Sequence, residues 1–238
     1  MSDYSYELAT QGNYLLKSKR YKEAIKFFDK ALGLNPQNGY AWYNKGVALD
    51  YLEQYEESIE CYYKAGAIHP QDQKIWTNIG FALNQTGRFE EAIKNLDKAI
   101  ALNPKNGYAW FHRARSYENL ERFKEVVECF DRVLEINPED EEAWFYRGNA
   151  LYQLKRYEDA IDSYNKMIKI NPESSQAFYN IACLSSILKK KSKVLEYLEK
   201  AIELDVGFKE KARTESDFNN VKDSDEFKNL INTRLRHS

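Results

Sequence analysis

The sequence predicts an all-α fold: a right-handed α-solenoid of stacked helix-turn-helix repeats that ends in a C-terminal capping helix. The regular spacings of proline and of tryptophan are the two observations behind this prediction. The five prolines are spaced 34 residues apart, at Pro36, Pro70, Pro104, Pro138 and Pro172. The four tryptophans repeat with the same period, six residues after a proline, at Trp42, Trp76, Trp110 and Trp144. A fixed period of this length indicates one small unit that is copied and that folds by stacking on its neighbours.

The period divides the chain into six repeats followed by a non-repetitive tail. With the proline at position 32 of each unit, the repeats cover 5–38, 39–72, 73–106, 107–140, 141–174 and 175–208. The last repeat is degenerate, because Val206 replaces the proline and Ser185 replaces a large core residue. We expect residues 209–238 to form a capping helical segment, since the terminal unit of such an array must be covered.

Each repeat has the residue pattern of two antiparallel helices joined by a tight turn. Large residues recur at positions 4, 11 and 24, and small residues recur at position 8, namely Gly12, Gly46, Gly80, Ala114, Gly148 and Ala182. Positions 4, 8 and 11 share one helical face, so the small residue lets the second helix approach closely. The proline ends the second helix, because it has no backbone N–H to donate and because it disfavours helical backbone angles at the preceding residue.

This pattern resembles the tetratricopeptide repeat (TPR) family. The segment 41–70, AWYNKGVALDYLEQYEESIECYYKAGAIHP, is similar to the family consensus over nearly its whole length, and the resemblance extends from Ser5 to about Phe208. It implies a superhelix in which the first helix of each repeat lines a concave groove, with positions 2, 5, 6, 9, 12 and 13 facing into it. It also implies a protein-binding scaffold.

The implied groove positions are rich in aromatic rings and amides. Tyrosine offers a large contact area with a polar tip, and an asparagine amide can pair with both the N–H and the C=O of an extended backbone. For any single tyrosine, packing between neighbouring first helices explains the residue equally well. The predicted peptide- or partner-binding residues are Tyr40, Tyr43, Asn44, Lys74, Asn78, Phe81, Tyr108, Phe111, His112, Arg115, Phe145, Tyr146, Asn149, Tyr179 and Asn180.

A charge pattern predicts ion pairs inside three of the repeats. Position 7 is basic in repeats two, four and five, and the same repeats carry an acid at position 22. We expect these side chains to join the two helices of one repeat, as Lys45–Glu60, Arg113–Glu128 and Arg147–Asp162. Partly exposed pairs of this kind contribute about 0–1 kcal/mol each.

The tail contains the signals of one amphipathic helix. Ser224 is suited to an N-cap, with Asp225 in the first turn, where a negative charge favours a helix. Phe227, Leu230 and Ile231 then form an apolar stripe. We expect this helix to cover the last repeat, and the alternative is that it docks onto another subunit.

Composition and charge exclude several classes of protein. The 35 basic and 37 acidic residues give a net charge of -2, which provides no electrostatic basis for binding nucleic acid or an anionic membrane. We recognise neither a signal peptide nor a transmembrane helix. The three cysteines are too few for a disulfide framework, so we expect free thiols and a cytoplasmic, reducing location.

The sequence contains no recognisable catalytic motif. His69, His112 and His237 fall at unrelated positions and form no zinc-binding spacing, and neither a glycine-rich phosphate loop nor a nucleophile elbow occurs. We therefore predict no catalytic residue, no metal site and no cofactor. The predicted function is a non-enzymatic protein-interaction scaffold that binds a peptide or partner segment in the groove. Two alternatives remain, a self-associating (homo-oligomeric) assembly protein and a targeting subunit of a larger enzyme complex.

Overall fold

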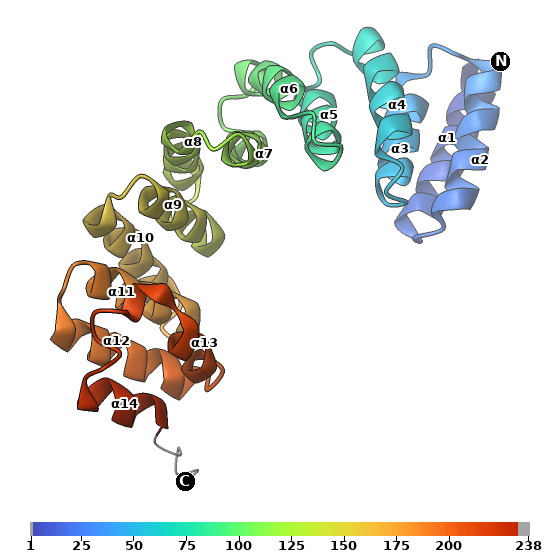
Figure 1. Ribbon diagram of the computed structural model, residues 1–238. Coiled ribbons are helices and arrows are strands. Elements are labelled where there is room, and N and C mark those ends of the chain that lie inside the picture. Colours follow the sequence, from blue (N-terminus) through green and yellow to red (C-terminus); the bar gives the residue numbers. More distant parts are fainter. Residues whose placement is uncertain (1, 233–238) are drawn as a thin grey trace. The chain divides into compact units, whose positions relative to one another are not determined.

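The computed structural model describes residues 2–232, and this range contains helices and turns with no strand. The predicted all-α solenoid is confirmed, because the helices pack in consecutive antiparallel pairs (Figure 1). Contacts divide the chain into two compact units, which are described separately: unit 1 is Met1–Ile136 and unit 2 is Asn137–Ser238.

Unit 1 contains four helix pairs, which match the first four repeats of the sequence. Their bounds are α1 (Ser2–Lys17) and α2 (Tyr21–Leu34), α3 (Gly39–Asp50) and α4 (Tyr55–Ile68), α5 (Gln73–Gln85) and α6 (Phe89–Leu102), α7 (Gly107–Asn119) and α8 (Phe123–Ile136). Each second helix also packs against the first helix of the following pair, so the pairs share a continuous core.

Unit 2 contains two helix pairs and the tail. The pairs are α9 (Glu141–Gln153) with α10 (Tyr157–Ile170), and α11 (Ser175–Ile187) with α12 (Lys191–Leu204). The tail forms α13 (Phe208–Thr214), the short 3-10 helix η1 (Ser216–Phe218) and α14 (Asp225–Asn232). It packs against α11 and α12, so the last repeat is covered by the chain itself.

The shared period of proline and tryptophan has a direct structural cause. The indole Nε1 of Trp42 donates a hydrogen bond of 2.9 Å to the carbonyl oxygen of Pro36, which ends the previous repeat. The same bond recurs from Trp76, Trp110 and Trp144 to the carbonyls of Pro70, Pro104 and Pro138. A half-buried ring with a polar tip thereby joins the turn between repeats to the next first helix.

The residues around each proline form a repeated turn and helix start. Asn35 Oδ1 accepts a hydrogen bond of 3.0 Å from the N–H of Gln37, which stabilises the turn. Asn38 then caps α3, because its Oδ1 accepts a bond of 3.0 Å from the N–H of Ala41. Both bonds recur at the starts of two later first helices. Asn103 and Asn106 make them before α7, and Asn137 and Asp140 make them before α9.

The glycines at position 8 allow the close helix approach that the sequence predicts. A Cβ atom added to Gly12 or to Gly46 would lie 2.7 Å from the ring of Phe28 or Tyr62, the fully buried residues at position 24. A Cβ on Gly148 would lie 2.6 Å from the ring of Tyr164. In these three repeats the second helix therefore places a large ring directly against the backbone of the first helix, and in repeat three Leu96 takes the same place against Gly80.

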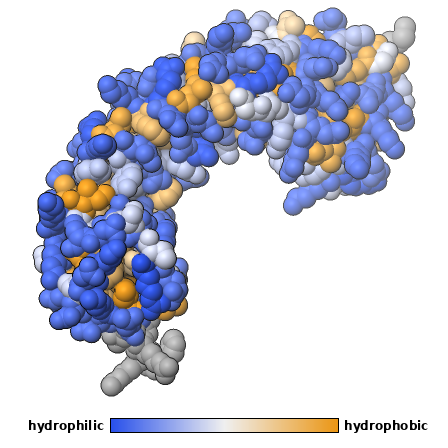
Figure 2. All heavy atoms as spheres, in the orientation of Figure 1, coloured by the Kyte–Doolittle hydropathy of each residue, from blue (hydrophilic) through white to orange (hydrophobic). Residues whose placement is uncertain are grey.

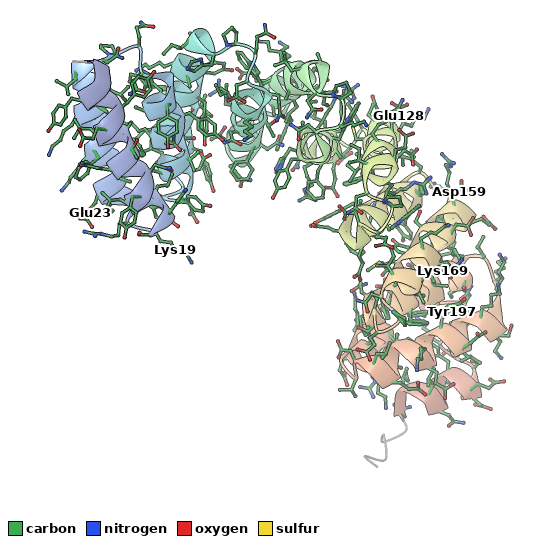
Figure 3. All side chains as sticks on the ribbon, turned by 180° about the vertical axis from the view of Figure 1, so that it is seen from behind. Lys19, Glu23, Glu128, Asp159, Lys169 and Tyr197 are labelled. Carbon is green, nitrogen blue, oxygen red and sulfur yellow. The ribbon has the colours of Figure 1, made fainter. Side chains whose placement is uncertain are left out.

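The predicted ion pairs within repeats are wrong for Lys45 and Arg113. Lys45 Nζ lies 2.6 Å from Asp29 Oδ1, and Arg113 Nε lies 2.8 Å from Asp97 Oδ1. Both acids belong to the second helix of the preceding repeat, at position 25. The predicted partner of Arg113, Glu128, is exposed on α8 (Figure 3). These pairs therefore join neighbouring repeats instead of the two helices of one repeat.

The third predicted pair concerns Arg147 in unit 2. Its Nη1 donates a hydrogen bond of 2.7 Å to the hydroxyl of Ser163, the residue next to its predicted partner Asp162. Arg113 makes the corresponding bond to Cys129, with 3.4 Å between Nη1 and Sγ. The guanidinium at position 7 thus bonds the side chain at position 23 of its own repeat.

The tail closes the core of the last repeat. Phe227 and Ile231 of α14 are buried together with Phe218 and with Leu198 of α12. The N–H of Phe227 lies 3.4 Å from Ser224 Oγ, the predicted capping atom. The apolar stripe of α14 therefore lies inside the molecule. On the face shown in Figure 2, hydrophobic residues form small separate groups among hydrophilic ones.

Candidate functional site

The candidate functional site is a pocket in unit 1, which we call the Asp50 pocket. Its volume is about 350 Å³, and it is lined by Val47, Asp50, Tyr51, Tyr62, Thr77, Asn78, Phe81, Tyr108 and His112. Apart from Tyr51, which directly follows α3, these residues come from α3, α4, α5 and α7, so three successive repeats contribute. Four of the predicted site residues meet here: Asn78, Phe81, Tyr108 and His112.

Asp50 is the acidic group of this pocket, and its environment disfavours its charge. Burial raises the pKa of the Asp50 carboxyl to about 6. The Tyr62 hydroxyl donates a hydrogen bond of 2.5 Å to Asp50 Oδ2. The second oxygen, Oδ1, is buried and has no hydrogen-bond partner among the described residues. Ser58 lies close by, but its hydroxyl proton is donated to the carbonyl of Tyr55.

The aromatic wall of the pocket surrounds a neutral histidine. The ring of His112 lies 5.3 Å from Phe81 and 5.4 Å from Tyr108, measured between centroids. Burial, assisted by the positive charge of Arg115, lowers the pKa of His112 to about 4. His112 is therefore uncharged near neutral pH and acts as one more aromatic surface.

The asparagines of unit 1 already use their amide N–H groups inside the protein. Asn44 is buried, and its Nδ2 donates a hydrogen bond of 2.8 Å to the carbonyl of Tyr40 on the same helix. Asn78 Nδ2 lies 3.3 Å from the hydroxyls of both Tyr43 and Tyr62. These bonds fix the position of the two amides, and Asn44, which is only 7% exposed, offers a ligand little surface.

A second hollow of unit 1 lies beside this pocket. Tyr40 and Tyr43 line a cavity of about 580 Å³ together with His69, Pro70 and Asp72. The cavity therefore lies where the turn after α4 meets α3 and α5. It brings two of the predicted residues together, but it is bordered by a turn as well as by first helices.

The tail of unit 2 covers one predicted site residue, Tyr179. Its ring is only 1% exposed, stacks on Phe208 at 4.6 Å between centroids and meets Phe218 edge-on at 5.8 Å. Lys211 Nζ lies 4.7 Å from the centroid of the same ring. The expectation that Tyr179 presents its surface to a partner is therefore corrected, because residues of the tail occupy that face.

Four further predicted residues of unit 2 have internal partners. Asn149 Oδ1 accepts a hydrogen bond of 2.7 Å from the Tyr164 hydroxyl. Asn180 Oδ1 accepts one of 2.6 Å from Gln176 Nε2. The rings of Phe145 and Tyr146 meet edge-on, 5.4 Å apart between centroids. Asn149 and Asn180 also line a small cavity of about 210 Å³, to whose lining residues of the tail contribute.

Three other predicted residues of unit 1, Phe111, Arg115 and Lys74, do not line the Asp50 pocket. Phe111 packs edge-on against Phe130 and His112, at 5.5 and 5.8 Å between centroids. Arg115 forms an ion pair with Glu118, one turn further along α7. Lys74 is exposed in the first turn of α5.

Our site prediction omitted Asp50, Tyr62 and Tyr152. Asp50 and Tyr152 occupy position 12, which the family resemblance places in the groove, so their residue types could have marked them. Tyr62 occupies the core position 24, where the ring fills space and only the hydroxyl reaches the pocket. That hydroxyl was the available signal, since phenylalanine fills the same position in two other repeats, as Phe28 and Phe130.

The described part of the chain contains no group of three or more His, Cys, Asp or Glu residues arranged to hold a metal ion. Within residues 2–232, no helix has the length and apolar character needed to cross a membrane. The cysteines Cys61, Cys129 and Cys183 are free and buried, and burial raises the pKa of the Cys61 and Cys129 thiols to about 11.

Family comparisons identify the class of this protein. Profiles described as tetratricopeptide repeat match residues 5–38, 39–72, 83–145, 141–174 and 175–205. The chain belongs to the tetratricopeptide repeat family. No curated protein sequence matches it significantly.

Solved structures share this fold at low sequence identity. YrrB, described as a TPR protein with an unusual peptide-binding site, superposes with a TM-score of 0.66 and 24% identity, covering 75% of this chain and 92% of YrrB. PilF of Pseudomonas aeruginosa superposes with a TM-score of 0.71 and 18% identity, and the match covers 90% of this chain and 99% of PilF. The C-terminal part of a TPR protein from Cytophaga hutchinsonii superposes with a TM-score of 0.76 and 18% identity, and the match covers 86% of this chain and 82% of that structure.

Proposed function

We propose that this chain is a non-catalytic protein-interaction scaffold and that the first-helix face of unit 1 binds a peptide or an extended segment of a partner protein. The Asp50 pocket is the centre of this face. It combines aromatic surface from Phe81, Tyr108 and His112 with a few polar groups, which is the composition expected of a binding site.

One observation in unit 2 supports this proposal above the others. There, the first-helix face of the last repeat holds a polypeptide segment, namely the tail of the chain itself. Phe208 and Phe218 cover Tyr179, and the Tyr152 hydroxyl lies 3.3 Å from Asp217 Oδ1. In unit 1 the face built from the same repeat positions carries no such segment among the described residues 2–232. The peptide-binding site of YrrB is consistent with this use of the fold.

Capture of a partner from native lysate tests the proposal. The variant for the binding face is Phe81→Ala with Tyr108→Ala, because both rings line the pocket. The matched control is Glu60→Ala with Lys94→Ala, which changes exposed residues on the second helices α4 and α6. Circular dichroism checks that each variant keeps its helices.

We expect the wild-type chain and the control to capture the same protein, and the Phe81→Ala, Tyr108→Ala variant to lose it. The partner should also bind the purified wild-type chain directly, through a segment that a synthetic peptide reproduces. Equal capture by all three proteins would contradict the proposal, because the partner would then bind a different face.

A further inference from the structure

The Asp50 pocket of unit 1 and the small cavity of unit 2 are built from the same repeat positions. Each uses positions 12 and 24 of one repeat and positions 5, 6 and 9 of the next. In unit 1 these residues are Asp50, Tyr62, Thr77, Asn78 and Phe81. In unit 2 they are Tyr152, Tyr164, Tyr179, Asn180 and Cys183.

In unit 2 the side chain at position 12 is a hydrogen-bond donor that binds an acidic group of the tail. The Tyr152 hydroxyl lies 3.3 and 3.4 Å from the two carboxylate oxygens of Asp217 on η1. Lys211 of α13 and Glu215, which directly follows α13, also line the cavity. Position 12 therefore matches the polarity of the polypeptide segment that lies on it.

In unit 1 the polarity at position 12 is reversed, because Asp50 is an acceptor. Tyr62 satisfies one of its oxygens, and the other has no partner among the described residues. The lining contains no lysine or arginine, and the only basic side chain, His112, is neutral near pH 7. The negative charge of Asp50 is therefore not balanced by any group that lines the pocket.

We propose that the Asp50 pocket binds a basic side chain, lysine or arginine, of the partner segment. The cationic group would lie against the part of the Asp50 carboxylate that faces the pocket and balance its charge. The apolar stem and the cation would lie against Phe81, Tyr108 and His112, whose ring faces attract positive charge. This inference rests on the proposed function, since it names the side chain by which the partner segment is recognised.

The alternative occupants fit the pocket less well. An acidic side chain would be repelled by Asp50 at short range in a partly buried site. A purely apolar side chain would leave the carboxylate further desolvated without a new hydrogen bond, which costs free energy. Charge complementarity therefore selects a cationic group.

Selection from a random peptide library on the immobilised full-length chain tests the inference. The same library is selected on Asp50→Asn, an isosteric variant that can still accept the Tyr62 hydrogen bond. Glu60→Gln is the matched control, because it removes one negative charge from an exposed position of the same repeat. Titration calorimetry then measures the binding of one selected peptide, with its basic residue either intact or replaced by norleucine.

We expect peptides selected on the wild-type chain and on Glu60→Gln to share a lysine or arginine. Replacing that residue by norleucine should weaken binding at least about tenfold on both proteins, as expected for a charged hydrogen bond. On Asp50→Asn the same replacement should change the affinity by less than about twofold, because the charge that it pairs with is absent.

Two results would overturn the inference while the proposed function stands. One is selection of peptides without a shared basic residue that nevertheless lose affinity on Phe81→Ala. The other is an equal loss from the norleucine replacement on wild type and Asp50→Asn. If the wild-type chain selects no peptide at all, both the inference and the proposed function are contradicted.

Discussion

At the scale of single residues, the Asp50 pocket holds two titratable groups whose effects on stability have opposite signs. The pKa of Asp50 is raised from 3.8 to about 6, and the pKa of His112 is lowered from 6.5 to about 4. In both groups, burial in the folded chain disfavours the charged form relative to the unfolded chain. Ionisation of Asp50 therefore destabilises the fold as the pH rises, whereas protonation of His112 destabilises it as the pH falls.

The Asp50→Asn variant should show the first of these effects. The contribution of Asp50 is fully present below pH 3.8 and is lost as the pH rises through about 6. The variant should therefore gain about 1–2 kcal/mol in free energy of unfolding, relative to wild type, between pH 4 and pH 7.5. Urea unfolding at the two pH values measures this, and an unchanged difference would contradict it.

The His112→Phe variant should show the opposite trend. The contribution of neutral His112 is present above pH 6.5 and is lost as the pH falls through about 4. When the pH is lowered from 7.5 to 4, the free energy of unfolding of the variant should rise by about 1–2 kcal/mol relative to that of the wild type. The same urea series tests this, and a gain at high pH instead would show that burial is not the cause of the shift.

Residue-level features were predictable from sequence only where the repeat fixes them. The period placed Asn78, Phe81, Tyr108 and His112 on first helices, and these four meet in one pocket. The raised pKa of Asp50 depends on a contact with Tyr62 and on local burial, which no spacing reveals.

At the scale of helices, the ion pairs show that a repeating charge pattern does not determine whether a side chain pairs within its own repeat or with the preceding repeat. Lys45 pairs with Asp29 and Arg113 with Asp97, each in the preceding repeat. Repeats three and six have Ile79 and Ile181 at position 7, and the preceding repeats carry Tyr63 and Asn165 at position 25. Position 7 is thus basic only where the preceding repeat carries an acid at position 25. This also accounts for repeat six, which has Ile181 at position 7 although it carries an acid, Glu196, at position 22.

A double-mutant cycle distinguishes the two pairings. Combining Lys45→Met with Asp29→Asn should give a coupling energy of about 0.5–1 kcal/mol, since Asp29 is half exposed. The cycle of Lys45→Met with Glu60→Gln should give a coupling near zero. Urea unfolding at low salt measures both, and a larger coupling to Glu60 would restore the pairing within the repeat.

Helix approach within a repeat depends on the glycine at position 8. Gly46→Ala should lower the free energy of unfolding by about 1–3 kcal/mol, because the new Cβ would lie 2.7 Å from the Tyr62 ring. Gly33→Ala is the matched control, since a Cβ there has no neighbour within 4 Å and alanine favours a helix by roughly 0.5–1 kcal/mol. Thermal unfolding of both variants checks the contrast, and equal destabilisation would contradict it.

At the scale of the whole chain, the tail was only partly predictable. The apolar stripe of Phe227, Leu230 and Ile231 correctly indicated a helix that packs on the last repeat. The coverage of Tyr179 by Phe208 and Phe218 was not predictable, because these residues lie at or beyond the end of the period. The family resemblance therefore assigned Tyr179 to the groove, although its face is occupied.

The tail should contribute strongly to the stability of unit 2. Phe218→Ala removes a fully buried ring and should cost about 3–5 kcal/mol. Asp223→Ala, at an exposed position of the same tail, should be nearly neutral. Urea unfolding compares the two variants, and light scattering at two concentrations shows whether exposure of Tyr179 leads to self-association. A neutral Phe218→Ala would contradict the capping role.

Hydrogen exchange of the wild-type chain with and without a bound partner peptide tests the central claim most directly. The peptide is one selected on the wild-type chain, and exchange is read helix by helix in unit 1. Binding on the first-helix face predicts slower exchange in α3, α5 and α7, around the Asp50 pocket. Slower exchange confined to the second helices α4, α6 and α8 would place the partner on the other face and contradict the account.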